Sequence, residues 1–267
     1  MSVLGDELHA LATRLAVQAG RMVRDGRAAH GITVRDTKSS NTDVVTEFDR
    51  ASEALIVGGI RAARPDDAII GEEGTSSRGT SGVSWLIDPI DGTTNFLYGL
   101  PGYAVSIGAK ASTGDEVGAV YVPATDELFA AVKGKGATLN GRPIHCGTNG
   151  ELAVSLVATG FSYLPARRAT QARRAAALLP MVRDIRRFGA AAVDLCYVAA
   201  GRLDAYYEEH LGPWDLAAGE LIAREAGCRS GSLDGGPVRP SSVLVANPAL
   251  FQPMQAMIAR IDADLAT

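Results

Sequence analysis

Two tight clusters of acids, one of them at the end of an apolar run, constrain the fold of this chain more than any other feature. The first cluster is Glu72-Glu73, and the second lies in the stretch Asp88-Pro89-Ile90-Asp91-Gly92-Thr93-Thr94. The run before it, Ser84-Trp85-Leu86-Ile87, is typical of a β-strand, and Pro89 predicts that this strand stops after Asp88. The two aspartates of the stretch then share one tight loop at a strand end.

Acids at this density indicate a metal site. Carboxylates held a few ångströms apart repel one another unless cations lie between them. Hard oxygen ligands without a nearby His or Cys favour Mg²⁺ over zinc. Gly92 and the threonines after it predict the start of a short helix, whose free backbone N–H groups form a phosphate site. A divalent metal and a phosphate group on one loop point to a metal-dependent phosphatase.

Each motif also has an ordinary structural interpretation. Glu72-Glu73 alone would be a solvated turn. Asp88 or Asp91 would cap the following helix, although one cap needs only one of the two. Asp215 would likewise cap the helix that begins near it, with Trp214 in the core, and capping is the better interpretation of that segment taken alone.

Composition agrees with a soluble enzyme. The chain has 267 residues, 46% of them hydrophobic, which is ample for one large domain or two lobes. The net charge of −4 gives no general attraction to nucleic acid or to an anionic membrane. Without an apolar run that could span a bilayer or serve as a signal peptide, we expect a cytoplasmic protein with no membrane partner. Three widely spaced cysteines predict neither a disulfide framework nor a zinc site.

The hydrophobic pattern predicts two αβ lobes of one catalytic domain, residues 1–150 and 151–267. The first lobe is expected to open with helices and to continue, over 69–132, as a largely antiparallel sheet with a hairpin at 117–132. In the second lobe the pattern is mixed. Strands are expected there at 152–158 and 203–207, and helices in the arginine-rich stretch and at 191–200, 214–226 and 250–265.

At these motifs the chain resembles the inositol monophosphatase family. Asp88–Phe96 looks like the family's metal-site signature, and Trp214–Gly219 resembles its C-terminal signature. Other matching stretches follow in the family's order over nearly the full length: Lys38-Ser39-Ser40 with Asp43-Val44-Val45-Thr46, Gly71-Glu72-Glu73-Gly74, and 189–208. The resemblance implies an α+β fold, a layered α-β-α-β-α sandwich with mostly antiparallel sheet in the N-terminal lobe and mixed sheet in the C-terminal lobe. The active site would lie between the lobes.

The resemblance also implies a set of metal ligands. Glu72, Asp88 and the backbone carbonyl of Ile90 would bind one Mg²⁺, and Asp88, Asp91 and Asp215 would bind a second. A third, weaker ion near Glu72 is typical of the family, so two or three ions are expected in each subunit.

The same pattern implies the catalytic residues. Thr93 would be the partner of Asp49, and together with Glu72 they would orient and deprotonate a water molecule on the metal. Direct attack of that water on phosphorus requires no protein nucleophile. The backbone amides of Gly92 and Thr93 would hold the phosphate oxygens.

Substrate contacts are implied less specifically. Glu208 would hydrogen-bond inositol hydroxyls, Ala191 would supply a backbone contact, and Asp91 and Asp215 would lie beside the substrate. Taken alone, Glu208 would equally be an exposed strand end. Ala190 departs from the family pattern, in which Ser or Thr is common. Specificity is therefore open among inositol phosphates, histidinol phosphate, fructose 1,6-bisphosphate and 3′-phosphoadenosine 5′-phosphate.

The protein expected from the resemblance is a lithium-sensitive, Mg²⁺-dependent, homodimeric phosphomonoesterase that hydrolyses myo-inositol monophosphate. A hypothesis of a different class is a regulatory protein that binds RNA polymerase or RNA, because some bacterial relatives also bind transcription machinery. Its other basis is the arginine-rich segment between residues 167 and 187. A solvated helix face is the commoner meaning of such a segment.

Overall fold

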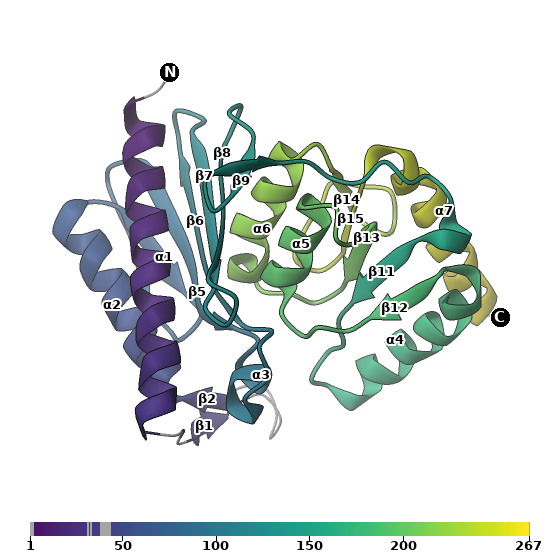
Figure 1. The fold of residues 1–267 in the computed structure, drawn as a ribbon, viewed down its shortest axis with the longest axis horizontal. Helices are drawn as coiled ribbons and strands as arrows, with labels where there is room; N and C mark the ends of the chain where they lie inside the picture. Colours follow the sequence, from purple (N-terminus) through teal and green to yellow (C-terminus); the bar gives the residue numbers. More distant parts are fainter. Residues whose placement is uncertain (1–2, 31, 33, 38–43, 267) are drawn as a thin grey trace.

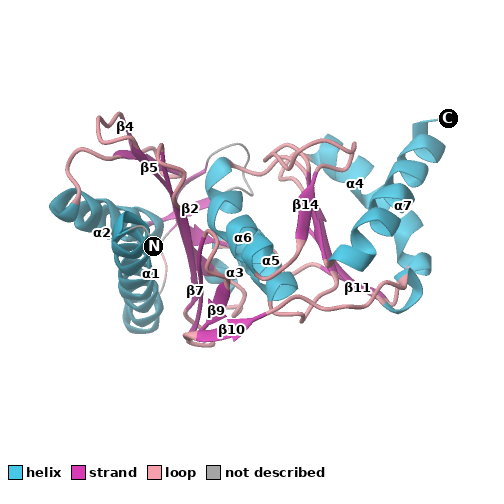
Figure 2. Cartoon of the chain, turned by 90° about the horizontal axis from the view of Figure 1, so that it is seen from above, coloured by secondary structure: helices cyan, strands magenta, loops and turns pink. Residues whose placement is uncertain are grey.

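The computed structural model describes residues 3–30, 32, 34–37 and 44–266, so Lys38 and Asp43 of the family pattern lie outside the described residues. Two large sheets alternate with three helical layers (Figures 1 and 2). The order of the layers is α-β-α-β-α, which confirms the predicted sandwich.

Two long helices, α1 (Val3–His30) and α2 (Glu47–Ala63), form the first layer. Their apolar residues recur at helical spacing. They form one core cluster with the face of the first sheet that points away from the middle layer. Thr46 caps α2: its hydroxyl accepts from the backbone N–H of Asp49 (3.4 Å), and the Asp49 carboxylate accepts from the backbone N–H of Thr46 (2.8 Å). This capping box fixes Asp49 at the start of the helix.

The first sheet has eight strands in the order β10-β9-β8-β7-β6-β5-β3-β4. Neighbouring strands are antiparallel except for β3 and β5, which confirms the largely antiparallel sheet and its hairpin. The strands are β3 (Ala68–Gly71), β4 (Ser76–Ser77), β5 (Val83–Asp91), β6 (Ala104–Ala111), β7 (Glu116–Val122), β8 (Glu127–Val132), β9 (Ala137–Leu139) and β10 (Arg142–Ile144). A separate antiparallel pair joins β1 (Val34–Thr37) and β2 (Val44–Thr46), and a short helix, α3 (Thr93–Tyr98), follows β5.

The prediction that the strand stops after Asp88 is wrong. β5 continues to Asp91, which pairs with Ala104 of β6 after a shift in register between Asp88 and Asp91. Pro89 lies within that shift, where a missing backbone N–H disturbs the ladder least. The Pro89 carbonyl accepts from the hydroxyl of Ser52 in α2 (2.9 Å), which holds the irregular segment in place.

The middle layer consists of α5 (Ala191–Ala199) and α6 (Pro213–Glu225). Its side chains belong to one core cluster with residues of both sheets, among them Val120, Phe129 and Val245. Both helices lie where the pattern predicts them. The middle layer therefore packs against both sheets.

The second sheet has the order β12-β11-β13-β15-β14 and is mixed, as predicted. β11 is parallel to both β12 and β13, while β15 is antiparallel to β13 and β14. Its strands are β11 (Leu156–Thr159), β12 (Asp184–Arg186), β13 (Ala205–Glu208), β14 (Arg229–Gly231) and β15 (Val243–Ala246). The last layer contains α4 (Pro165–Leu178) and α7 (Pro248–Ala266).

Two strand boundaries of the second sheet also differ from the sequence prediction: the strand expected at 203–207 lies at Ala205–Glu208, and the one expected at 152–158 starts later. Leu152–Val154 forms a 3₁₀ turn, η1, and the strand begins only at Leu156; a second such turn, η2 (Leu179–Met181), follows α4. The hydroxyl of Ser155 donates to the carbonyl of Glu151 (2.6 Å) and so closes the first turn. Among the described helices, none is long and apolar enough to cross a membrane.

Candidate active site

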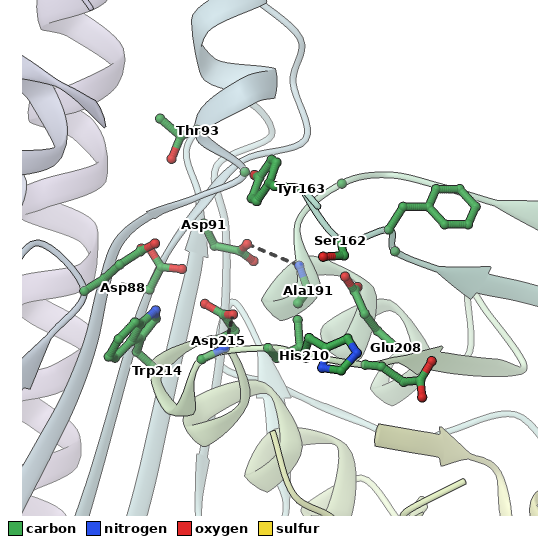
Figure 3. Close-up of a pocket in the computed structure, with 18 of the residues that line it drawn as sticks. Asp88, Asp91, Thr93, Ser162, Tyr163, Ala191, Glu208, His210, Trp214 and Asp215 are labelled. Carbon is green, nitrogen blue, oxygen red and sulfur yellow. Dashed lines mark hydrogen bonds between the residues drawn. The ribbon is translucent and has the colours of Figure 1, made fainter. Parts of the chain in front are cut away.

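A cavity of about 510 Å³ brings together the predicted site residues of the two predicted lobes except Asp49, which is buried and does not line it. Figure 3 shows the acids Asp88, Asp91 and Asp215 on one side, and Ser162, Glu208 and His210 on the other. The acid side lies at the carboxyl ends of β3 and β5, and the other side at the carboxyl ends of the parallel strands β11, β12 and β13. Crevices outside the carboxyl ends of parallel strands are common ligand sites.

Parallel pairing of β3 and β5 places Glu72 beside Asp88. Gly71 lies opposite Ile87, and the backbone N–H of Glu72 donates to the Ile87 carbonyl (3.1 Å). Glu72, which follows Gly71, and Asp88, which follows Ile87, therefore lie side by side. Glu72, Asp88 and Asp215 each offer a carboxylate oxygen, and these three oxygens lie within 4.8 Å of one another.

Glu53 of α2, which was not predicted as a site residue, holds the loop that carries Glu72. Its buried carboxylate accepts from the backbone N–H groups of Glu73 (2.9 Å) and Thr75 (3.1 Å) and from the Thr75 hydroxyl (2.6 Å). The only sequence signal was a charged residue on the apolar face of a predicted helix. Glu53 supports the site without lining the cavity.

Asp215 satisfies both interpretations of its segment. It is the third residue of α6, and its carboxylate accepts from the backbone N–H of Gly212 (2.8 Å), as a helix-capping residue does. It also belongs to the three-acid group. Trp214, expected in the core under the capping interpretation, is only partly buried and lines the cavity.

Asp91 caps a helix, but not the helix that follows it in sequence. Its carboxylate accepts from the backbone N–H groups of Ala191 (3.2 Å) and Ala192 (2.6 Å) at the start of α5. Asp91 lies outside the three-acid group, so its role as a ligand stays a prediction. The same holds for the substrate contact of the Ala191 amide. Ala190, the N-cap residue of α5, makes no side-chain cap bond, and Asp91 supplies that bond from another part of the chain.

Thr93 and Asp49 lie together, as the resemblance implies. The Thr93 hydroxyl lies 3.2 Å from Asp49 Oδ1 and 3.0 Å from the carbonyl oxygen of Ile90, within hydrogen-bond reach of both. The Ile90 backbone is itself fixed, because its N–H donates to Asp88 Oδ1 (3.0 Å). The hydroxyl, the Ile90 carbonyl and the acids thus border one space.

Gly92 occupies a position that accepts no side chain. Its φ is +86°, and a Cβ there would lie 2.8 Å from the carbonyl oxygen of Gly102 and 3.0 Å from Cβ of Ala190. Thr93 then starts α3, as predicted. The phosphate contacts of these two amides remain a prediction.

The electrostatics of the acid group favour a bound cation. Burial raises the pKa of Asp88 well above its ordinary value, and the charges of Glu72, Asp91 and Asp215 raise it further. Burial likewise raises the pKa of Asp215. The described donor group contains only carboxylates, without His or Cys, and hard oxygen ligands of this kind fit Mg²⁺.

Glu208 lines the cavity and is partly buried, so it is not an exposed strand end. The hydroxyl of Tyr206, two residues earlier on the same face of β13, donates to Glu208 Oε2 (2.6 Å). Burial raises the pKa of Glu208 to about 7. The carboxylate therefore has a defined position facing the acid side (Figure 3).

Several residues of the cavity wall were not predicted to line it, although Arg167 and Arg187 belong to the arginine-rich segment. They follow the parallel strands of the second sheet, where only the strand pairing reveals that they converge. They are Ser162, Tyr163, Arg167, Arg187 and His210.

Comparison with known proteins agrees with this geometry. A model of the inositol monophosphatase family matches residues 5–262. The inositol-1-monophosphatase of Mycobacterium leprae is 40% identical over 277 residues, covering 96% of this chain and 95% of that protein. The Nus factor SuhB of Escherichia coli K12 is 40% identical over 250 residues, covering 92% and 93%.

A solved structure shares the fold. The extragenic suppressor protein suhB of Bartonella henselae superposes with a TM-score of 0.88 at 35% identity, covering 94% of this chain and 98% of that one. The family model matches nearly the whole chain, and the acids of the family's motifs meet in one cavity. This chain belongs to the inositol monophosphatase family and is a phosphatase.

Proposed function

We propose that the protein is a Mg²⁺-dependent phosphomonoesterase that hydrolyses myo-inositol monophosphate to inositol and phosphate. The observation that carries this proposal is one cavity lined by the three-acid group, the Gly92-Thr93 turn and Glu208. Carboxylates on one side can bind the metal, which in turn binds the phosphate. The Glu208 carboxylate on the other side can accept hydrogen bonds from the hydroxyls of a polyol. The name of the Mycobacterium leprae relative supports the same substrate.

Two or three Mg²⁺ ions would be held by the acid side. Glu72, Asp88 and the Ile90 carbonyl are the proposed ligands of one ion, and Asp88, Asp91 and Asp215 those of a second. Bound Mg²⁺ lowers the pKa of a coordinated water and neutralises charge on the phosphate oxygens.

The chain's own groups would orient the attacking water. The Thr93 hydroxyl carries one hydrogen, so it donates to either Asp49 or the Ile90 carbonyl, and its lone pairs remain available to accept from a water molecule. Asp49 and Glu72 would take the proton. The N–H groups of Gly92 and Thr93 would hold the phosphate oxygens.

On the substrate side, Glu208 would accept hydrogen bonds from the polyol, with Asp91, Asp215 and the Ala191 backbone beside the ring. The missing hydroxyl at Ala190 leaves other esters as alternatives served by the same mechanism: histidinol phosphate, fructose 1,6-bisphosphate and 3′-phosphoadenosine 5′-phosphate.

The test is phosphate release from these four esters by the purified protein, with and without Mg²⁺. We expect release that depends on Mg²⁺, is fastest with inositol 1-phosphate and is inhibited by Li⁺ at millimolar concentration. Preference for another ester would reassign the substrate and keep the mechanism, whereas no Mg²⁺-dependent release from any ester would contradict the proposed function.

We also propose a homodimer, supported by an apolar surface beside the cavity. Tyr98 is 76% exposed, Leu100 53% and Phe188 36%. Asn95 holds this surface together. Its side-chain amide donates to the Phe188 carbonyl (2.6 Å), and its backbone carbonyl accepts from the N–H of Leu100 (2.9 Å). Light scattering should give a dimer for the wild type and a monomer for Leu100→Glu. A monomeric wild type would contradict the proposal.

A second candidate function is binding of RNA polymerase or RNA. One relative carries the name Nus factor SuhB, and Arg167, Arg168 and Arg173 are exposed along α4. The binding should persist in Asp88→Asn and weaken in Arg173→Glu. Failure of both RNA polymerase and RNA to co-purify with the protein would exclude this function.

A further inference from the structure

The backbone of Gly160 passes unusually close to the Glu208 carboxylate. Gly160 follows β11 directly, and the parallel register of β11 and β13, with Thr159 opposite Tyr207, brings it level with Glu208. A Cβ built on Gly160 would lie 1.8 Å from Oε2 of Glu208 and 2.1 Å from Oε1. The carboxylate therefore fills the space that any side chain at residue 160 would need.

Tyr206 fixes the carboxylate from the other side. Its ring is fully buried, and its hydroxyl donates to the same oxygen, Glu208 Oε2, at 2.6 Å. The hydroxyl of a buried ring has little freedom to follow a displaced partner. The Glu208 carboxylate is thus confined between the Gly160 backbone and the Tyr206 hydroxyl.

We infer that Gly160 is a positioning residue for substrate recognition, because the absence of its side chain allows Glu208 to lie against Tyr206 at the cavity wall. This inference rests on the proposed function, in which Glu208 contacts the polyol. Gly160 does not have a positive φ, so its backbone conformation accepts other residues. What selects glycine at residue 160 is the space that Glu208 occupies.

Substitution at Gly160 should therefore act on Glu208 and leave the fold intact. The group that meets the new Cβ is the end of a flexible side chain, which moves at lower cost than backbone. In Gly160→Ala the carboxylate should leave Tyr206 and no longer meet the polyol. We expect KM for inositol 1-phosphate to rise about tenfold with little change in kcat, because a contact remote from phosphorus contributes to binding in both the ground and transition states.

A double-mutant cycle tests whether Gly160 acts through Glu208. KM and kcat are measured for wild type, Gly160→Ala, Glu208→Ala and the double variant, with inositol 1-phosphate and with p-nitrophenyl phosphate, which has no polyol hydroxyls. If Gly160 acts only through Glu208, Gly160→Ala should add nothing in the Glu208→Ala background. Neither variant should alter KM for the aryl ester by more than about twofold.

The matched control is Gly147→Ala. There the new Cβ would meet only Oδ1 of Asp204, at 3.7 Å, an ordinary contact, so the kinetics should not change. Urea unfolding of each variant reports whether the fold is intact. A crystal structure of Gly160→Ala should show the Glu208 carboxylate displaced from the Tyr206 hydroxyl.

The outcomes separate this inference from the proposed function. If Glu208→Ala raises KM for inositol 1-phosphate but Gly160→Ala does not, or if the two effects add, the inference is overturned and the proposed function stands. A carboxylate that stays on Tyr206 in the crystal structure of Gly160→Ala also overturns it. If Glu208→Ala leaves KM unchanged, the substrate contact in the proposed function fails, and the inference fails with it.

Discussion

Asp91 joins the first sheet to the middle helical layer, because its carboxylate accepts a 2.6 Å hydrogen bond from the backbone N–H of Ala192 at the start of α5. Asp91 ends a strand of the first sheet, whereas α5 packs between the sheets. A residue implied to bind metal therefore also caps the central helix. Loss of activity on its substitution would by itself not distinguish these two tasks.

Asp91→Asn should lower both stability and activity. An amide offers one acceptor oxygen in place of two, so one of the two backbone N–H groups at the start of α5 loses its partner, and we expect a loss of about 1–2 kcal/mol in the free energy of unfolding. Adding Ala190→Ser supplies a new N-cap oxygen and should restore most of that stability. Urea unfolding and phosphatase assays of both variants separate the tasks. Restored activity in the double variant would contradict a role in metal or substrate binding.

Asp88→Asn should abolish the response to Mg²⁺. The carboxylate belongs to the three-acid group, so we expect turnover to fall by about 10²-fold or more. In the wild type each tenfold excess of Mg²⁺ over its Kd should add about 1.4 kcal/mol of stability, which thermal unfolding detects as a rise in Tm. Without Mg²⁺ the variant should be no less stable than the wild type, because it removes one of several like charges. An unchanged Mg²⁺-dependent rise in Tm would refute the metal assignment.

Glu53→Gln should weaken the use of Mg²⁺ without removing any proposed ligand. The neutral amide loses the charge-assisted bonds to Glu73 and Thr75, so the loop that carries Glu72 is held less firmly. The Mg²⁺ concentration for half-maximal activity should rise about tenfold, as is usual when support of a ligand is lost. Glu7→Gln, on the exposed side of α1, is the control. Equal metal dependence of Glu53→Gln and wild type would show that the loop is positioned without Glu53.

Asp67→Asn should reduce stability in a pH-dependent way. Burial raises the pKa of Asp67, but hydrogen bonds from Arg64, Ser81 and Trp85 outweigh it, so the pKa lies below its ordinary value. These bonds hold the start of β5. We expect a loss of about 1–3 kcal/mol at pH 7 on substitution to Asn.

The pH dependence of that loss has a definite sign. A carboxyl whose pKa is lowered by folding stabilises the protein above its unfolded pKa of about 4, and this contribution disappears as the pH falls through the folded pKa. The stability difference between wild type and Asp67→Asn should therefore shrink below about pH 4. Urea unfolding from pH 3 to pH 8 measures it, with the exposed neighbour in Asp66→Asn as control. A difference constant over this range would exclude the ionised carboxylate as its source.

Much of the acid side of the site was predictable because four of its residues are neighbours in sequence. Asp88, Ile90, Asp91 and Thr93 lie within one short segment, so the spacing and the apolar run before them already define a strand end. The path of β5 beyond Asp88 was not predictable, because pairing with β6 resumes only through a change in register. The family resemblance implied Asp49 and Asp215, of which the local pattern alone marked only Asp215, as a capping residue.

The burial of two charged residues, Arg174 and Asp194, could not be predicted from the sequence. Arg174 belongs to the arginine-rich segment, yet it is buried and bonds Asp262 of α7 (2.7 Å) and the Glu209 carboxylate. Asp194 is also buried in α5, and neither of its oxygens has a hydrogen-bond partner among the described residues. Helical periodicity placed both residues in helices but did not show which of their faces would be covered.

In the proposed function, the arrangement of strand ends around the cavity separates the residues for hydrolysis from those for substrate recognition. The acids lie at the carboxyl ends of β3 and β5 or at the start of α6, whereas Glu208 and most of the opposite wall lie at or after the carboxyl ends of β11, β12 and β13. Substitutions in those later loops change the surface offered to the alcohol part of an ester and leave the acids in place. In the proposed function, a chain with this architecture can thus acquire a new leaving group through a few changes in those loops, while the acids of β3, β5 and α6 keep phosphate hydrolysis unchanged.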